Sequence, residues 1–156
     1  MNTLTKLVAS SFLSLGVVMS ASAASHRVDA AVNWTKNVGN EGRAYLFGVE
    51  HPTKYVPYPF GSHAPSAPAT DTQSGWNLPS SWGGQVDAAV NWGKGYTYLF
   101  RGTEYVRYDI GANKPASDPK DTSGWNLPSS WGGQVDAAVN WGNGSVYLFS
   151  GTEYVR

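Results

Sequence analysis

The chain has 156 residues, which suit a single domain with its own core, and its 11 basic residues balance 11 acidic ones. Both signs of charge are scattered along the chain, which excludes the basic patch typical of nucleic-acid binding. The absence of cysteine excludes a disulfide-stapled module and a thiol nucleophile, while seven Trp, nine Tyr and 18 Gly favour short strands joined by tight turns.

Residues 1–23 have the layout of a secretory signal peptide. Lys6 precedes an apolar run from Leu7 to Met19, and Ala21-Ser22-Ala23 supplies small residues for cleavage. The run is too short for a bilayer span, which needs roughly 20 residues. We therefore predict a secreted protein, extracellular or periplasmic, with no membrane span and with its folded part in residues 24–156.

A repeat occupies the rest of the chain. The heptapeptide Val-Asp-Ala-Ala-Val-Asn-Trp occurs three times, at residues 28–34, 86–92 and 135–141. Residues 74–107 match residues 123–156 at a constant offset of 49, with 30 of 34 positions identical. The four differing pairs are Lys94/Asn143, Tyr96/Ser145, Thr97/Val146 and Arg101/Ser150. A fixed period of this length indicates a stacked architecture.

We divide the chain into a first unit at about 26–75, a second at about 76–124 and a partial third at about 125–156. Within the second unit we expect an inner strand at Val86–Trp92, followed by strands at Tyr96–Phe100 and Glu104–Asp109. The polar stretch Gly111–Thr122 reads as a surface connection with room for a short outer strand or helix.

Three or four short strands in about 49 residues match one blade of a β-propeller. The Ala-Ala pair of each inner strand supports this interpretation, because large side chains would collide where several inner strands crowd around a narrow axis. The predicted fold class is therefore all-β.

The ordered signatures of each unit resemble hemopexin repeats. Asp-Ala-Ala and Tyr-Leu-Phe occur in all three units, whereas Gly-Thr-Glu-Tyr-Val-Arg and Trp-x-x-Pro-x-x-Trp occur in the second and third, and the resemblance extends over residues 26–156. The resemblance implies a four-bladed propeller with a central channel, of which this sequence carries two full repeats and part of a third, or about two and a half blades. We expect a fragment of a longer chain, and completion of the ring in a homo-oligomer is the alternative.

The resemblance also implies an ion, calcium or sodium, held in the channel by main-chain carbonyls. Carried over residue by residue, these carbonyls belong to Asp29, Ala31, Asp87, Ala89, Asp136 and Ala138. Hard cations accept backbone oxygens as ligands. The alternative is that each Asp side chain caps its strand by bonding a neighbouring backbone amide.

Haem binding is a further alternative that the resemblance raises, and haem needs a positioned axial ligand. The histidines are His26, His51 and His63, none of which stands at a repeated position. We expect exposed loop histidines and no haem.

The tryptophans suggest either sugar stacking or packing between blades. We expect packing, because all seven stand at repeated positions: Trp34, Trp76, Trp82, Trp92, Trp125, Trp131 and Trp141. The positions that differ between the near-identical units, such as Lys94, Tyr96 and Arg101, are better pointers to a surface.

No catalytic motif is visible. There is no Gly-x-Ser-x-Gly elbow, and Glu104 and Glu153 stand at turn-to-strand positions where a solvated or Arg-paired role is common. We predict a non-enzymatic binding module for a small molecule, a glycan or a protein partner, with cell-surface or matrix adhesion as the leading version. A structural spacer within a longer secreted toxin or adhesin is the rival interpretation.

Overall fold

The structure is a computed structural model that describes residues 27–34 and 42–156. The predicted signal peptide and His26 lie outside the described residues. Within those ranges, no helix has the length and apolar content that crossing a membrane requires.

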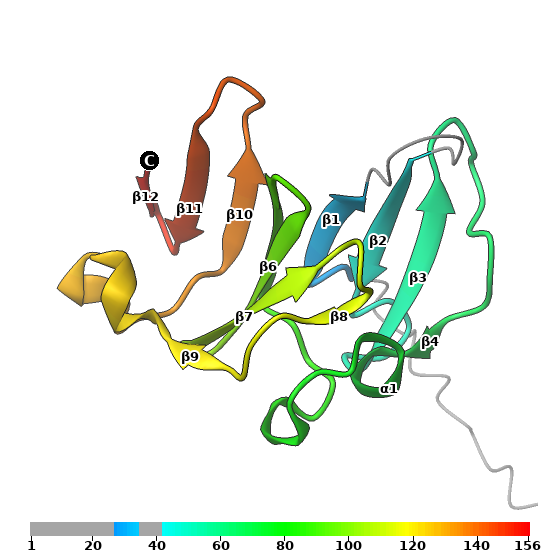
Figure 1. Ribbon diagram of the computed structural model, residues 1–156, viewed down its shortest axis with the longest axis horizontal. Coiled ribbons are helices and arrows are strands. Elements are labelled where there is room, and N and C mark those ends of the chain that lie inside the picture. Colours follow the sequence, from blue (N-terminus) through cyan, green and yellow to red (C-terminus); the bar gives the residue numbers. More distant parts are fainter. Residues whose placement is uncertain (1–26, 35–41) are drawn as a thin grey trace, which may run out of the picture.

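Three antiparallel sheets follow one another along the chain (Figure 1). The first sheet has the order β1-β2-β3-β4 and is built from β1 (Ala30–Trp34), β2 (Arg43–Phe47), β3 (Lys54–Pro59) and β4 (Thr70–Asp71). The helix α1 (Thr72–Trp76) and the short 3₁₀ helix η1 (Ser80–Trp82) lead from it to the second sheet.

The second sheet repeats this plan with the order β5-β6-β7-β8, and β9 also pairs with β7. Its strands are β5 (Ala88–Gly93), β6 (Tyr96–Arg101), β7 (Glu104–Asp109), β8 (Lys114–Pro115) and β9 (Lys120–Asp121). The helices η2 (Thr122–Trp125) and η3 (Ser129–Trp131) follow. The third sheet consists of β10 (Ala137–Asn140), β11 (Val146–Ser150) and β12 (Glu153–Val155).

These elements confirm the strands predicted for the second unit, with shifts of one or two residues at three strand ends. The inner strand begins at Ala88, two residues later than expected. The polar connection carries the two-residue strands β8 and β9, and η2 begins at its last residue, Thr122. The chain is all-β with three antiparallel sheets, as predicted.

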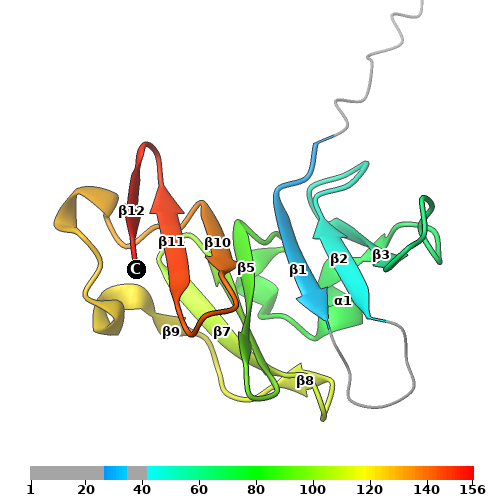
Figure 2. The ribbon, with the colours of Figure 1, turned by 90° about the horizontal axis from the view of Figure 1, so that it is seen from above.

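The first strand of every sheet lies on the inside of the molecule. Figure 2 shows β1, β5 and β10 side by side, with β5 in the middle and the other strands extending outward. The predicted innermost strands are therefore confirmed. Alanine permits this approach, since Ala88 and Ala89 are only 1% and 2% exposed.

Asparagine side chains tie the inner strands together. Asn91 Nδ2 donates to the main-chain oxygen of Asn33 at 3.1 Å, and Asn140 Nδ2 donates to that of Asn91 at 2.9 Å. The Oδ1 atoms of Asn91 and Asn140 accept from the backbone N–H two residues on, Gly93 and Gly142, both at 2.9 Å. One side chain thus supports the end of its own strand and the junction with the preceding sheet.

Two apolar clusters lie between successive sheets. The first contains Trp34, Trp76 and Tyr108, and the second contains Phe100, Trp131 and Leu148. The first cluster is rich in edge-to-face ring contacts, such as those of Trp76 with Trp34 at 5.2 Å. Such contacts add to the area buried by large rings.

Glu104 and Glu153 each accept a hydrogen bond from a tryptophan side chain. Glu104 Oε2 accepts a hydrogen bond from Trp82 Nε1 at 2.8 Å, and Glu153 Oε2 accepts one from Trp131 Nε1 at 2.7 Å. Each carboxylate satisfies the polar edge of an indole that is otherwise buried. Glu153 is exposed, as expected of a solvated carboxylate, whereas Glu104 is partly buried; the indole partner of each was not expected.

The expectation that every tryptophan is a packing residue holds only in part. Trp34, Trp76, Trp82 and Trp131 are buried, and Trp125 is partly buried, but Trp92 is 41% exposed and Trp141 is 68% exposed. Trp92 and Trp141 are exposed because, within the described chain, no side chain covers them at the ends of their inner strands. Identical residues in successive repeats therefore have different environments.

Candidate functional site

The three Asp-Ala-Ala segments line one cavity of about 270 Å³. It lies where the inner strands begin, so that equivalent residues of three sheets meet around it. All six residues of the predicted ion site are among its lining residues: Asp29, Ala31, Asp87, Ala89, Asp136 and Ala138. We call this space the axial cavity.

The aspartate side chains are held by groups of their own sheet. Asp87 accepts from Gly102 N at 2.7 Å, and Asp136 accepts from Gly151 N at 2.7 Å. Both glycines lie in the turn after the second strand of their sheet with φ of 55°, a left-handed conformation that favours glycine. The side chains of Asp87 and Asp136 therefore bond a backbone amide, which was the alternative to an ion site in the sequence-based prediction.

Arginine adds a charged partner to two of the three aspartates. Arg101 Nη1 lies 2.6 Å from Asp87 Oδ1, and Arg27 Nε lies 2.7 Å from Asp29 Oδ1. Arg101 also donates to Gln85 Oε1. Arg101 was predicted only as a surface position that varies between units, and its place beside the axial cavity was missed, because its partner lies 14 residues earlier.

The chemistry of the lining leaves main-chain oxygens as the available ligands. Alanine side chains have no donor atoms, the carboxylates of Asp87 and Asp136 accept hydrogen bonds from turn amides, and that of Asp29 pairs with Arg27. Residues 27–34 and 42–156 contain no group of three or more His, Cys, Asp or Glu side chains placed to hold a metal ion. A hard cation that takes backbone oxygens fits this donor set, whereas a soft transition metal does not.

A second cavity of about 280 Å³ continues along the same inner strands. It shares Ala31, Ala89 and Ala138 with the axial cavity, and its far end is lined by Asn33, Asn91 and Asn140. The side chains of Asn91 and Asn140 donate hydrogen bonds to the backbone of the preceding inner strand, which holds this end of the cavity in place.

The described histidines are exposed residues of irregular segments. His51 Nδ1 lies 2.9 Å from the Thr53 hydroxyl, within the turn between β2 and β3, and His63 follows β3. This is the environment expected for them from the sequence.

Comparisons with known proteins find one matching family model and several similar folds. The family model described as Hemopexin matches residues 86–129. Among solved structures, a plant lectin with two metal binding sites from Cicer arietinum has a TM-score of 0.65 at 20% identity, over 82% of this chain and 61% of that chain. No curated protein matches the chain in sequence.

Two further structures extend the comparison. A seed albumin from Lathyrus sativus has a TM-score of 0.66 at 20% identity, covering 81% of this chain and 58% of that one. A hemopexin fold protein from cow pea has a TM-score of 0.62 at 19% identity, covering 81% and 60%. The chain spans about three fifths of the length of these structures. Together with the family match over residues 86–129, they confirm the hemopexin-like fold predicted from the sequence.

Proposed function

We propose that this chain of hemopexin-like repeats is a secreted, non-enzymatic binding module whose axial cavity holds a cation such as Ca²⁺ or Na⁺. The observation that carries the proposal is the convergence of the six predicted residues, from three repeats, on one cavity. The ligands are the main-chain carbonyls of Asp29, Ala31, Asp87, Ala89, Asp136 and Ala138. In this proposal the three sheets are blades of a four-bladed propeller, and the cation neutralises carbonyl dipoles that meet on its axis.

Two further observations support the cation. The Asp side chains are oriented by turn amides and arginine, so the inner-strand backbone is held in place before an ion arrives. The Cicer arietinum lectin of the same fold is described as having two metal binding sites. The cation is structural in this proposal, since it holds the inner strands at a fixed separation.

Calcium should raise the thermal stability of the chelator-treated protein. A ligand that binds only the folded state stabilises it by about 2.7 kcal/mol at a hundred-fold excess over Kd. We expect Ala31→Val to remove this effect, because Ala31 lines the axial cavity and a larger side chain reduces the space for an ion. Thermal unfolding with and without Ca²⁺ or Na⁺ is the measurement.

The matched control for this experiment is Ala112→Val, the same substitution at an exposed residue of the β7–β8 turn. It should keep the full calcium effect. If neither Ca²⁺ nor Na⁺ changes the unfolding temperature of the native protein, the axial ion does not exist.

For the partner, we propose a glycan. Aromatic faces beside polar groups are suited to sugar rings. The Cicer arietinum relative is described as a lectin.

A glycan array probed with the labelled full chain tests this proposal. We expect saturable binding to a defined set of glycans, competed by an excess of the matching free sugar. The rival interpretation, a structural spacer, requires the opposite result: no saturable glycan binding by the native protein.

A further inference from the structure

One position beside the axial cavity differs among the three sheets. In each sheet the N–H of the cavity aspartate donates to a phenylalanine main-chain oxygen of the second strand. The residue that follows this phenylalanine is Gly48 in the first sheet, Arg101 in the second and Ser150 in the third. The three aspartates therefore have equivalent backbone partners and different neighbouring side chains.

Arg101 is bonded to two side chains of its own unit. Its Nη1 atom lies 2.6 Å from Asp87 Oδ1, and its Nη2 atom donates to Gln85 Oε1. The other carboxylate oxygen of Asp87 accepts from Gly102 N at 2.7 Å. Since Asp87 lines the axial cavity, a permanent positive charge is held one side chain away from that cavity.

The third unit has the same acceptors without the arginine. Asp136 accepts from Gly151 N at 2.7 Å, and Gln134 stands 49 residues after the Gln that Arg101 contacts. Ser150 takes the place of Arg101, at one of the four positions where the two units differ. The second and third units therefore present the same aspartate to the cavity with and without a neighbouring positive charge.

In the first unit a more exposed arginine pairs with the aspartate. Gly48 has a φ of 80°, and a Cβ atom there would collide with the Asp29 carboxylate. Asp29 instead lies 2.7 Å from Arg27 Nε, and the Arg27 side chain is 63% exposed against 36% for Arg101. Because solvent screens an exposed pair, Arg101 has the larger electrostatic effect of the two arginines.

A fixed guanidinium beside the cavity has two effects on a cation. It repels the cation directly, and it neutralises the Asp87 carboxylate, which would otherwise attract the cation. Both effects are proportional to the charge of the ion, so a divalent ion is disfavoured twice as strongly as a monovalent one. The main-chain carbonyls are unchanged when this side chain is replaced, because they belong to the backbone.

We propose that Arg101 sets the ion preference of the axial cavity by weakening the binding of Ca²⁺ more than that of Na⁺, an inference that rests on the axial cation of the proposed function. Arg101 contacts Asp87 and lies outside the lining of the cavity, so it determines specificity without being a ligand.

The unfolding temperature of the chelator-treated full chain, measured against Ca²⁺ and against Na⁺, gives an apparent Kd for each ion. Choline chloride keeps the ionic strength constant. In Arg101→Ser the Kd for Ca²⁺ should fall about ten-fold and that for Na⁺ about three-fold, as their charges require. The reciprocal variant Ser150→Arg should raise both values by similar factors, because it places a guanidinium beside Asp136.

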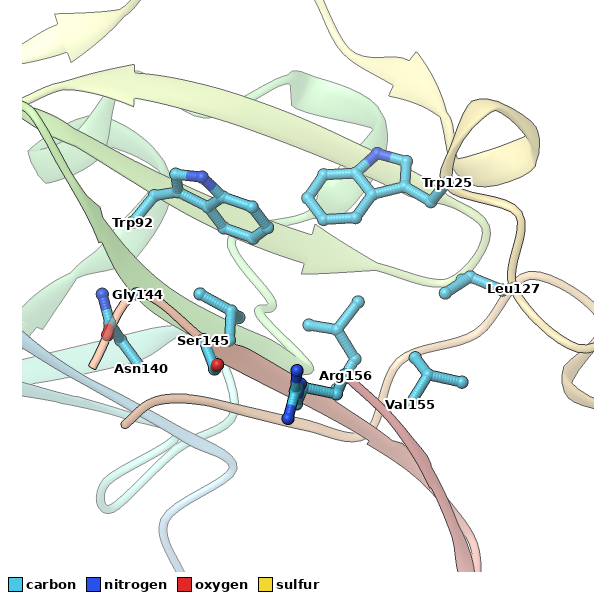
Figure 3. A pocket seen from close by; sticks show the side chains of 10 residues that line it. Trp92, Trp125, Leu127, Asn140, Gly144, Ser145, Val155 and Arg156 are labelled. Atoms are coloured by element: carbon cyan, nitrogen blue, oxygen red, sulfur yellow. The ribbon is translucent and has the colours of Figure 1, made fainter. Parts of the chain in front are cut away.

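Two control variants change charge away from the axial cavity. Lys94→Asn removes one positive charge from the exposed turn between β5 and β6 and introduces the residue of the third unit. Ser145→Arg adds one beside the space between the second and third sheets that Figure 3 shows, which shares no lining residue with the axial cavity. Both variants should keep the native ratio of the two Kd values, and circular dichroism checks that each variant folds.

A native ratio of the two Kd values in both Arg101→Ser and Ser150→Arg would overturn the inference and leave the axial ion in place. Lower stability of Arg101→Ser with an unchanged ratio would do the same, since it would make the arginine purely structural. If neither ion raises the unfolding temperature of the native chain or of any variant, the axial ion and the role of Arg101 fail together.

Discussion

Replacing Trp34 with alanine should lower the free energy of unfolding by about 3–5 kcal/mol, the usual loss for a large ring removed from a core. Trp34 is 8% exposed and contacts the rings of Tyr45, Trp76 and Tyr108. The same substitution at Trp141, which is 68% exposed, should cost below about 1 kcal/mol. Trp92→Ala, with 41% exposure, should fall between them.

The three variants form a controlled series, since each removes the same residue from the same heptapeptide. Urea unfolding followed by far-ultraviolet circular dichroism measures the three losses, and a constant m value would show that one transition is being compared. Equal losses at the three positions would mean that the described difference in burial is wrong.

Raising the pH from about 10 to about 12 should destabilise the protein through Tyr108. Burial raises the pKa of Tyr108 to about 12, and the neighbouring Tyr45 and Tyr55 act in the same direction. In the unfolded chain a tyrosine titrates near pH 10. The stability linked to the neutral phenol is therefore complete below about pH 10 and is lost as the pH rises toward 12, because the unfolded state releases its proton first.

Tyr108→Phe should flatten this part of the stability profile. At neutral pH it should cost about 1 kcal/mol, because the Tyr108 hydroxyl donates to Asn113 Oδ1 at 3.2 Å. Some alkaline loss should remain, since burial and Tyr45 also raise the pKa of Tyr55. Tyr154→Phe, at a ring that is 64% exposed, is the matched control. An unchanged profile in Tyr108→Phe would refute the assignment to this residue.

The strands could be predicted because their signals are local. Alternating apolar residues and turn glycines stand within each unit, and the offset of 49 transfers one unit's interpretation to the next. The inner position of β5 could also be predicted, because only small side chains suit a crowded axis and Ala88-Ala89 provides them. The meeting of Asp29, Asp87 and Asp136 at one cavity follows from the same reasoning.

Side-chain partners could not be predicted, because they depend on residues brought together by folding. Glu104 accepts from Trp82, 22 residues earlier, and Asn91 reaches Asn33, 58 residues earlier. The sequence places identical heptapeptides at Trp34 and Trp92, and only the packing of the following sheet distinguishes a buried indole from an exposed one.

The hydrogen bonds that Asn91 and Asn140 donate between inner strands both point toward the N-terminal side of the chain. Asn91 donates to the strand that precedes its own sheet in the chain, and Asn140 donates to β5 in the same way. On a ribosome the earlier sheet emerges first, so each acceptor is already in place when the sheet that carries its donor is synthesised. A backward-reaching donor therefore suits vectorial assembly, in which every completed sheet is the template on which the next one docks.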